Sequence, residues 1–170
     1  MSDRNYLPWW RLDNAAKIFP STSSAHDSKV FRFFCELEEP VEPEALQSAL
    51  DRTMERFPIY RCVLRRGWFW YYLEESPLPA LARPEQTPPC FPIYPSFRRS
   101  LLFRVLYYRR RISLEVYHVL SDGAGALDFL RVLVYEYLYV RHPEDGLSAS
   151  GVPVLGISDQ QKEADSFQKY

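Results

Sequence analysis

One histidine of this sequence stands where its side chain could do acid–base chemistry. The stretch "ISLEVYHVLSDGAGALDFL" places His118 at the end of an apolar strand pattern, four residues before Asp122, which Gly123 follows. A neutral imidazole has a pKa of about 6.5 and can accept a proton near neutral pH. Side chains at a strand-to-helix turn lie at the end of a sheet, where ligands tend to bind, so His118 is a candidate general base.

Each residue of this motif also has an ordinary structural interpretation. The period of two puts His118 on one strand face with three apolar residues, Ile112, Leu114 and Val116, so it could be a core histidine satisfied by backbone groups. Asp122 could be a plain helix N-cap, followed by turn glycines. The joint pattern is harder to explain, because chance should produce it in about one of two hundred such sequences.

The elements expected to position the motif define an α+β fold. Alternating residues predict strands over 9–19 and 29–39, a hairpin over 59–76 hinged near Gly67, and a second hairpin formed by 101–108 and 112–120 with a solvated arginine tip. Helical spacing predicts a helix from Pro43 to Phe57 and a largely buried one over 124–140. Residues 20–28 and the proline-rich stretch 76–99 are predicted to be loops. We expect a mostly antiparallel, mixed sheet covered by two main helices.

Composition excludes several classes of function. The net charge is -1 and the pI is near 6.3, which disfavours nucleic acid as a partner. Charged residues interrupt every apolar run, so no membrane span is expected. Three cysteines without a CxxC pair indicate a reducing, cytoplasmic location. His26 and His142 have no ligand spacing to His118, so no metal site is expected.

The motif and its neighbours resemble a known superfamily. "HVLSDG" resembles the HxxxDG motif of acyltransferases that include chloramphenicol acetyltransferase, nonribosomal peptide condensation domains and plant acyl-CoA-dependent enzymes. "RFPIYR" resembles their segment after the first helix, with Arg61 at the position of an arginine that reaches the motif aspartate. "WWRLDNAAKIF" is similar to the opening of bacterial alcohol acetyltransferase-like members. Tyr117 differs from the second histidine that many relatives carry before the motif histidine.

The resemblance implies roles for these residues. His118 would be the general base that removes a proton from an alcohol or amine acceptor as it attacks an acyl thioester, carried by CoA or by a carrier. Asp122 would pair with Arg61 to hold the turn, and Gly123 would allow a close backbone approach. Acyl-CoA is then the expected co-substrate, with no tightly bound cofactor. A noncatalytic binding or assembly module with the same fold is the alternative function.

The resemblance also implies a division of the chain. Residues 1–145 would form the N-terminal lobe of a two-lobe CoA-dependent acyltransferase fold, and 146–170 a linker or crossover toward an absent second lobe. An isolated lobe is expected to leave the face of Ile112, Leu114 and Val116 uncovered. That exposed apolar face would meet the missing C-terminal lobe or support self-association, and His118 would keep its ordinary pKa.

Overall fold

A computed structural model describes residues 8–12, 19–24, 27–93 and 99–148, and the statements below concern these residues. The chain forms an α+β fold, which confirms the predicted class. Its elements in order are β1 (Trp9–Arg11), α1 (Phe19–Thr22), β2 (Val30–Glu36), α2 (Pro43–Arg56), the 3-10 turn η1 (Pro58–Arg61), β3 (Cys62–Arg66), β4 (Tyr71–Glu75), β5 (Ala82–Pro84), β6 (Phe103–Tyr108), β7 (Arg111–Tyr117), α3 (Gly123–Arg141) and η2 (Pro143–Asp145).

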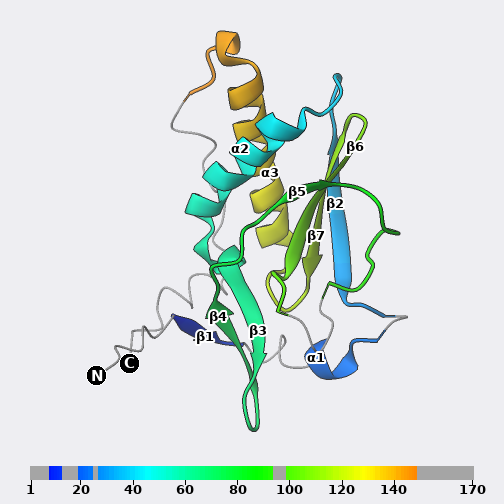
Figure 1. The fold of residues 1–170 in the computed structure, drawn as a ribbon, viewed down its shortest axis with the longest axis vertical. Helices are drawn as coiled ribbons and strands as arrows, with labels where there is room; N and C mark the ends of the chain where they lie inside the picture. Colours follow the sequence, from blue (N-terminus) through cyan, green and yellow to red (C-terminus); the bar gives the residue numbers. More distant parts are fainter. Residues whose placement is uncertain (1–7, 13–18, 25–26, 94–98, 149–170) are drawn as a thin grey trace.

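The strands form two sheets (Figure 1). The larger has the order β2-β7-β6-β5, in which only β5 and β6 pair in parallel, and the smaller has the order β1-β4-β3. The helices α2 and α3 lie side by side against the larger sheet. The β3–β4 hairpin extends from the end of the molecule opposite to the C-terminal end of α3. The larger sheet therefore has one face under helices and a second face on which other segments can lie.

The two long helices begin where the sequence chemistry starts them. Pro43 occupies the first turn of α2, where its missing N–H costs nothing, and Pro58 follows the end of the helix. Asp122 is the N-cap of α3, and its carboxylate accepts a hydrogen bond from the backbone N–H of Gly125 at 2.8 Å. Both predicted helices are confirmed to within about two residues.

The apolar face of β7 is covered. Ile112, Leu114 and Val116 are fully buried in the core formed with the helices. The expectation that this face is exposed in the isolated lobe is therefore wrong, because α2 and α3 already remove it from water. Self-association through this face loses its basis.

Several element boundaries differ from the sequence predictions. A short helix, α1, begins at Phe19, the last residue of the predicted first strand, and runs into the predicted loop 20–28. β5 lies within the predicted proline-rich connection, where it adds to the sheet edge beside β6. The predicted strand 112–120 ends at Tyr117. The predicted strand over 9–19 appears as β1, which ends at Arg11. Residues 13–18 lie outside the described residues, as do 149–170 of the predicted linker. No helix in the described ranges is long and apolar enough to cross a membrane.

Candidate functional site

His118 lies in the turn that follows β7 rather than within the strand. The backbone N–H of His118 donates to the carbonyl oxygen of Lys29 at 2.9 Å, one residue beyond the β2–β7 ladder. The chain then turns, with the N–H of Leu120 bonded to the carbonyl of Tyr117 at 2.8 Å. The side chain of His118 is exposed, unlike the buried apolar residues of β7, so it is not a buried core histidine. It contacts Phe31, whose partner in the sheet register is Val116.

Two phenyl rings fix the position of the His118 imidazole. The ring centroid lies 4.3 Å from that of Phe31 and 5.3 Å from that of Phe19, which is stacked on it. Phe19 begins α1, and Ser23 just beyond this helix shares a hydrogen bond of 2.8 Å with the Tyr117 hydroxyl. Tyr117 thus ties α1 to the end of β7, and α1 in turn presents Phe19 to the imidazole. Neither ring nitrogen of His118 has a hydrogen-bond partner within the described part of the chain.

The environment of His118 favours its neutral form. Burial against the rings lowers the pKa of His118 from its ordinary 6.5; the Asp122 carboxylate acts in the opposite direction, and the Lys29 ammonium adds to the decrease. The expectation of an unperturbed pKa is wrong, because the desolvating rings belong to this chain and not to a second lobe. A lowered pKa leaves the imidazole unprotonated, and able to accept a proton, at pH 7.

An NMR titration of His118 is expected to give a pKa below 6.5. Comparison with the His118→Gln variant would assign its ring resonances, and Phe19→Ala should move the pKa back toward 6.5 by removing one desolvating ring. A His118 pKa at or above 6.5 in the parent chain would contradict this description of the site.

An open groove of about 580 Å³ runs past the imidazole. One wall is the segment Asp27–Val30 at the start of β2, and the other is the proline-rich segment Pro88–Pro92. Four of its lining residues carry reactive or charged groups: Asp27, Lys29, Cys90 and His118. The groove is therefore assembled from three parts of the chain that are far apart in sequence.

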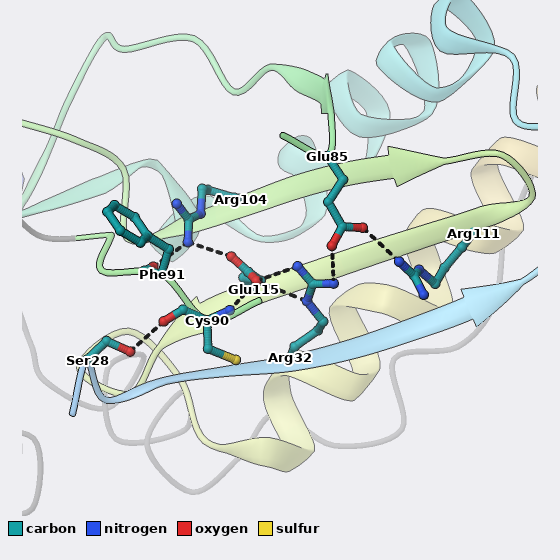
Figure 2. Close-up of polar contacts among 8 residues, drawn as sticks. All are labelled: Ser28, Arg32, Glu85, Cys90, Phe91, Arg104, Arg111 and Glu115. Carbon is teal, nitrogen blue, oxygen red and sulfur yellow. Dashed lines mark hydrogen bonds and ion pairs between the residues drawn. The ribbon is translucent and has the colours of Figure 1, made fainter. Parts of the chain in front are cut away.

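Glu115 anchors the proline-rich wall to the sheet (Figure 2). Its side chain is fully buried, on the β7 face opposite the one that packs on the helices, and pairs with Arg32 of β2 at 2.7 Å. The same carboxylate pairs with Arg104 of β6, and it accepts the backbone N–H of Cys90 at 2.7 Å. Arg104 also donates to the carbonyl of Phe91. We call Arg32, Glu85, Arg104, Arg111 and Glu115 the charged cluster.

The cluster extends along the sheet through Glu85. Arg32 and Arg111 pair with its carboxylate at 2.6 and 2.9 Å. Burial would raise the pKa of Glu85, but the hydrogen bonds from these two arginines lower it below its ordinary value. Charges of both signs thus compensate one another under the segment 85–91, where an unpaired charge would be costly.

Contacts with the charged cluster and with Ser28 also affect the position of Cys90 and the protonation of its thiol. This residue has a positive φ of 58°, and its carbonyl accepts a hydrogen bond of 2.7 Å from the Ser28 hydroxyl. Burial raises the pKa of the Cys90 thiol, and the Glu115 carboxylate raises it further. The thiol is therefore protonated near pH 7, which disfavours Cys90 as a nucleophile beside His118.

The expected ion pair between Arg61 and Asp122 is not formed. Arg61 lies in η1 with an exposed side chain, and it makes no ion pair with any of the described residues. The Asp122 carboxylate instead caps α3 through Gly125. The ordinary N-cap interpretation of Asp122 thus describes its contact. The sequence alternation failed for Arg61 because Pro58–Arg61 is a 3-10 turn rather than strand.

Tyr60, next to Arg61, is the residue of this segment that lies under the motif. It is fully buried, its ring stacks on Phe129 of α3 at 4.2 Å, and the Ser121 hydroxyl and Asp122 carboxylate are close enough to influence its titration. Burial raises the pKa of Tyr60 well above its ordinary value. Its hydroxyl makes no hydrogen bond with a described residue. Tyr60 therefore supports the turn by packing.

Gly125, not Gly123, is the glycine that this turn requires. A Cβ on Gly125 would lie 2.5 Å from the Ser121 hydroxyl oxygen and 3.3 Å from the capping oxygen of Asp122. A Cβ on Gly123 would meet only Phe33, at 3.9 Å, which is an ordinary contact. The close approach that the resemblance implied for Gly123 is thus not needed within the described residues.

Matched alanine substitutions test this difference. Gly125→Ala is expected to lower the free energy of unfolding by about 1 kcal/mol, because displacing the cap outweighs the better helix propensity of alanine. Gly123→Ala should be neutral or stabilising by a few tenths of a kcal/mol. Urea denaturation of both variants measures the difference, and equal stabilities would contradict it.

The sequence analysis missed Phe19, Phe31, Lys29 and the 88–92 wall of the groove. Only Phe31 carried a usable signal, since it lay on the predicted apolar face of the β2 strand. Among the described residues, no three His, Cys, Asp or Glu side chains gather closely enough to hold a metal ion.

Comparison with solved structures identifies the fold as that of part of a condensation domain. The chain superimposes on the starter condensation domain of rhizomide synthetase RzmA with a TM-score of 0.69 and 14% sequence identity, covering 94% of this chain and 43% of that one. It also resembles polyketide synthase associated protein 5 from Mycobacterium tuberculosis, with a TM-score of 0.59, 14% identity, and coverage of 85% and 36%.

A third similar structure is the complex of the X-domain and OxyB from teicoplanin biosynthesis, with a TM-score of 0.58, 15% identity, and coverage of 83% and 34%. The chain thus spans less than half the length of the solved structures it matches. Scans of protein-family models and of curated proteins found no match. At these identities the similarity establishes the fold.

Proposed function

We propose that this chain is the N-terminal lobe of an acyltransferase that moves an acetyl or other acyl group from a CoA or carrier-bound thioester to an alcohol or amine. One observation carries the proposal: His118 presents an unbonded imidazole with a lowered pKa at an open groove. The fold likeness supports it, because mutants of the RzmA starter condensation domain have been solved in complex with C8-CoA and with C8-CoA and Leu-SNAC.

The proposed reaction uses His118 as the base. Its free ring nitrogen takes the proton of the acceptor O–H or N–H while the acceptor atom bonds to the thioester carbonyl carbon. The carbon–sulfur bond then breaks, and the leaving thiolate takes the proton back from the imidazolium. Asp122 holds the turn that carries His118 by capping α3, and Gly125 leaves the room that this cap needs.

The proposal includes the organisation of the chain. Residues 1–145 form the lobe, and residues 146–170 lead toward a second lobe that supplies the other side of the substrate channel. Acyl-CoA acts as a co-substrate rather than as a resident cofactor. The three cysteines are unpaired, which supports a reducing, cytoplasmic location.

A noncatalytic binding module is the second candidate. The observations that favour it are the likeness to an X-domain that was solved in complex with OxyB, and the absence of an ion pair between Arg61 and Asp122. In this case the same groove would take part in recognition, without proton transfer at His118.

Thiol release from acetyl-CoA distinguishes the two functions. The assay uses a panel of alcohols and amines with the 170-residue chain, and with the chain plus any natural continuation beyond Tyr170. Acceptor-dependent release that requires His118 supports the transferase. No turnover from either protein favours the binding module.

A further inference from the structure

The turn between β3 and β4 exposes three consecutive aromatic side chains. Trp68, Phe69 and Trp70 keep 96%, 87% and 54% of their surface in contact with solvent. Residues at hairpin tips are usually glycine, asparagine, aspartate or serine, whose chemistry suits turns and water. Leaving large aromatic groups in water forgoes the burial that normally stabilises a fold. The exposed aromatic tip therefore indicates a surface that binds an apolar partner.

The turn has a defined shape. The N–H of Gly67 donates to the carbonyl of Trp70 at 2.7 Å, which closes the hairpin. A Cβ on Gly67 would lie 3.2 Å from that carbonyl oxygen, closer than a side chain normally sits. The backbone thus holds Trp68 and Phe69 at the outermost point of the hairpin instead of folding them back on the sheet.

Positive charge lies directly behind the aromatic tip. The stretch 65–73, "RRGWFWYYL", holds two arginines and no acidic residue. Arg65 pairs with Glu74 at 2.6 Å, whereas Arg66 is exposed and forms no ion pair with a described residue. Arg11 of β1, paired in register with Tyr72, is likewise exposed and outside the ion pairs of the described chain. The hairpin end is therefore apolar at its point and cationic behind it.

The shape of this end suits a bilayer better than a protein. Figure 1 shows the hairpin projecting from the molecule, away from the helices. A stable protein interface buries about 800 Å² on each partner, which a narrow tip does not offer, whereas three side chains can enter a lipid surface. Trp9 lies edge-on to Tyr72, with ring centroids 6.1 Å apart, so amphipathic aromatic rings stand behind the tip. Tryptophan and tyrosine prefer the interfacial level of a membrane.

We propose that the β3–β4 hairpin inserts Trp68 and Phe69 into the headgroup–acyl boundary of a membrane that contains anionic lipid. Trp70 and the rings of Trp9 and Tyr72 then lie at headgroup level, and Arg66 and Arg11 contact lipid phosphates. The inference is independent of the proposed acyl transfer.

Flotation with vesicles tests the proposal. The chain is mixed with vesicles of phosphatidylcholine alone or of phosphatidylcholine with phosphatidylglycerol. It should float with the anionic vesicles, with its tryptophan emission shifted to shorter wavelength. The double variant Trp68→Ser, Phe69→Ser should bind at least about tenfold more weakly. Arg66→Gln should weaken binding to the anionic vesicles by about fivefold and leave binding to phosphatidylcholine unchanged.

The matched control is Phe34→Ser, Tyr108→Ser, which removes two aromatic rings that are 59% and 50% exposed elsewhere on the surface. This variant should bind the anionic vesicles as the parent does. Failure of the parent to float with anionic vesicles, or equal binding by the tip variant, overturns the proposal. The proposal is also overturned if the parent is a dimer that does not bind vesicles and the tip variant is a monomer. That result would assign the tip to a protein partner.

Discussion

Replacement of His118 by alanine is expected to lower acyl transfer by roughly 10²–10⁴-fold, the usual contribution of a positioned general base. The loss should fall on transfer and not on folding, because the side chain is exposed and its ring contacts are with Phe19 and Phe31 at the end of the sheet. In the parent, kcat/KM should rise with pH and reach a plateau above the pKa of His118, because only the neutral imidazole accepts a proton. The midpoint of the rise should lie below 6.5, because burial lowers this pKa.

The controls for this prediction separate the base from the turn that carries it. His142→Ala removes a histidine at the C-terminal end of α3 and should leave transfer unchanged. Asp122→Ala should reduce transfer and also lower the free energy of unfolding by about 1 kcal/mol, through loss of the α3 cap. Near-parental transfer by the His118→Ala protein would remove His118 as the base.

Glu115→Gln is expected to lower the free energy of unfolding by about 3 kcal/mol, because it leaves two arginines around a buried site without a full counter-charge. The pair with Arg32 lies almost wholly out of water, so solvent screens it little. The amide can still accept the N–H of Cys90, and the loss therefore measures the charge and not the shape of the side chain.

A second measurement, the labelling rate of the Cys90 thiol, tests whether Glu115→Gln loosens the proline-rich wall of the groove. With Cys35 replaced by serine and Cys62 buried, the thiol of Cys90 is the one open to labelling, and Glu115→Gln should speed its reaction by loosening the segment 85–91. Glu36→Gln is the matched control, because its pair with Arg110 is exposed and spans 3.4 Å. Equal stability and equal labelling rates in both variants would show that Glu115 does not anchor the wall.

Local sequence chemistry predicted the elements whose ends carry clear start and stop signals. Pro43 and Pro58 bracket α2, and the Asp122 cap starts α3, so both helices were found with their buried faces. β5 was missed because three residues ending in Pro84 carry almost no strand signal, and they pair only at the sheet edge. Its position depends on β6, which the local sequence cannot show.

The candidate site was predictable at the motif and not around it. His118 and Asp122 lie in a local pattern, whereas only the fold brings Phe19 to the imidazole and Lys29 and Cys90 to the groove. The alternation that placed Arg61 opposite Asp122 failed because it assumed a strand where the chain makes a 3-10 turn. Glu115 gave no signal either, since its partner Arg32 stands on the mixed face of a strand 83 residues away.

The place of β7 in the larger sheet has a consequence for synthesis of the chain. β2 pairs only with β7 in that sheet, yet the ribosome makes residues 30–36 long before residues 111–117. At translation speeds of 5–20 residues per second the delay is on the order of ten seconds. During that time the three phenylalanines of β2 have no sheet to join. The nascent chain thus offers an aromatic strand to chaperones until β7 emerges.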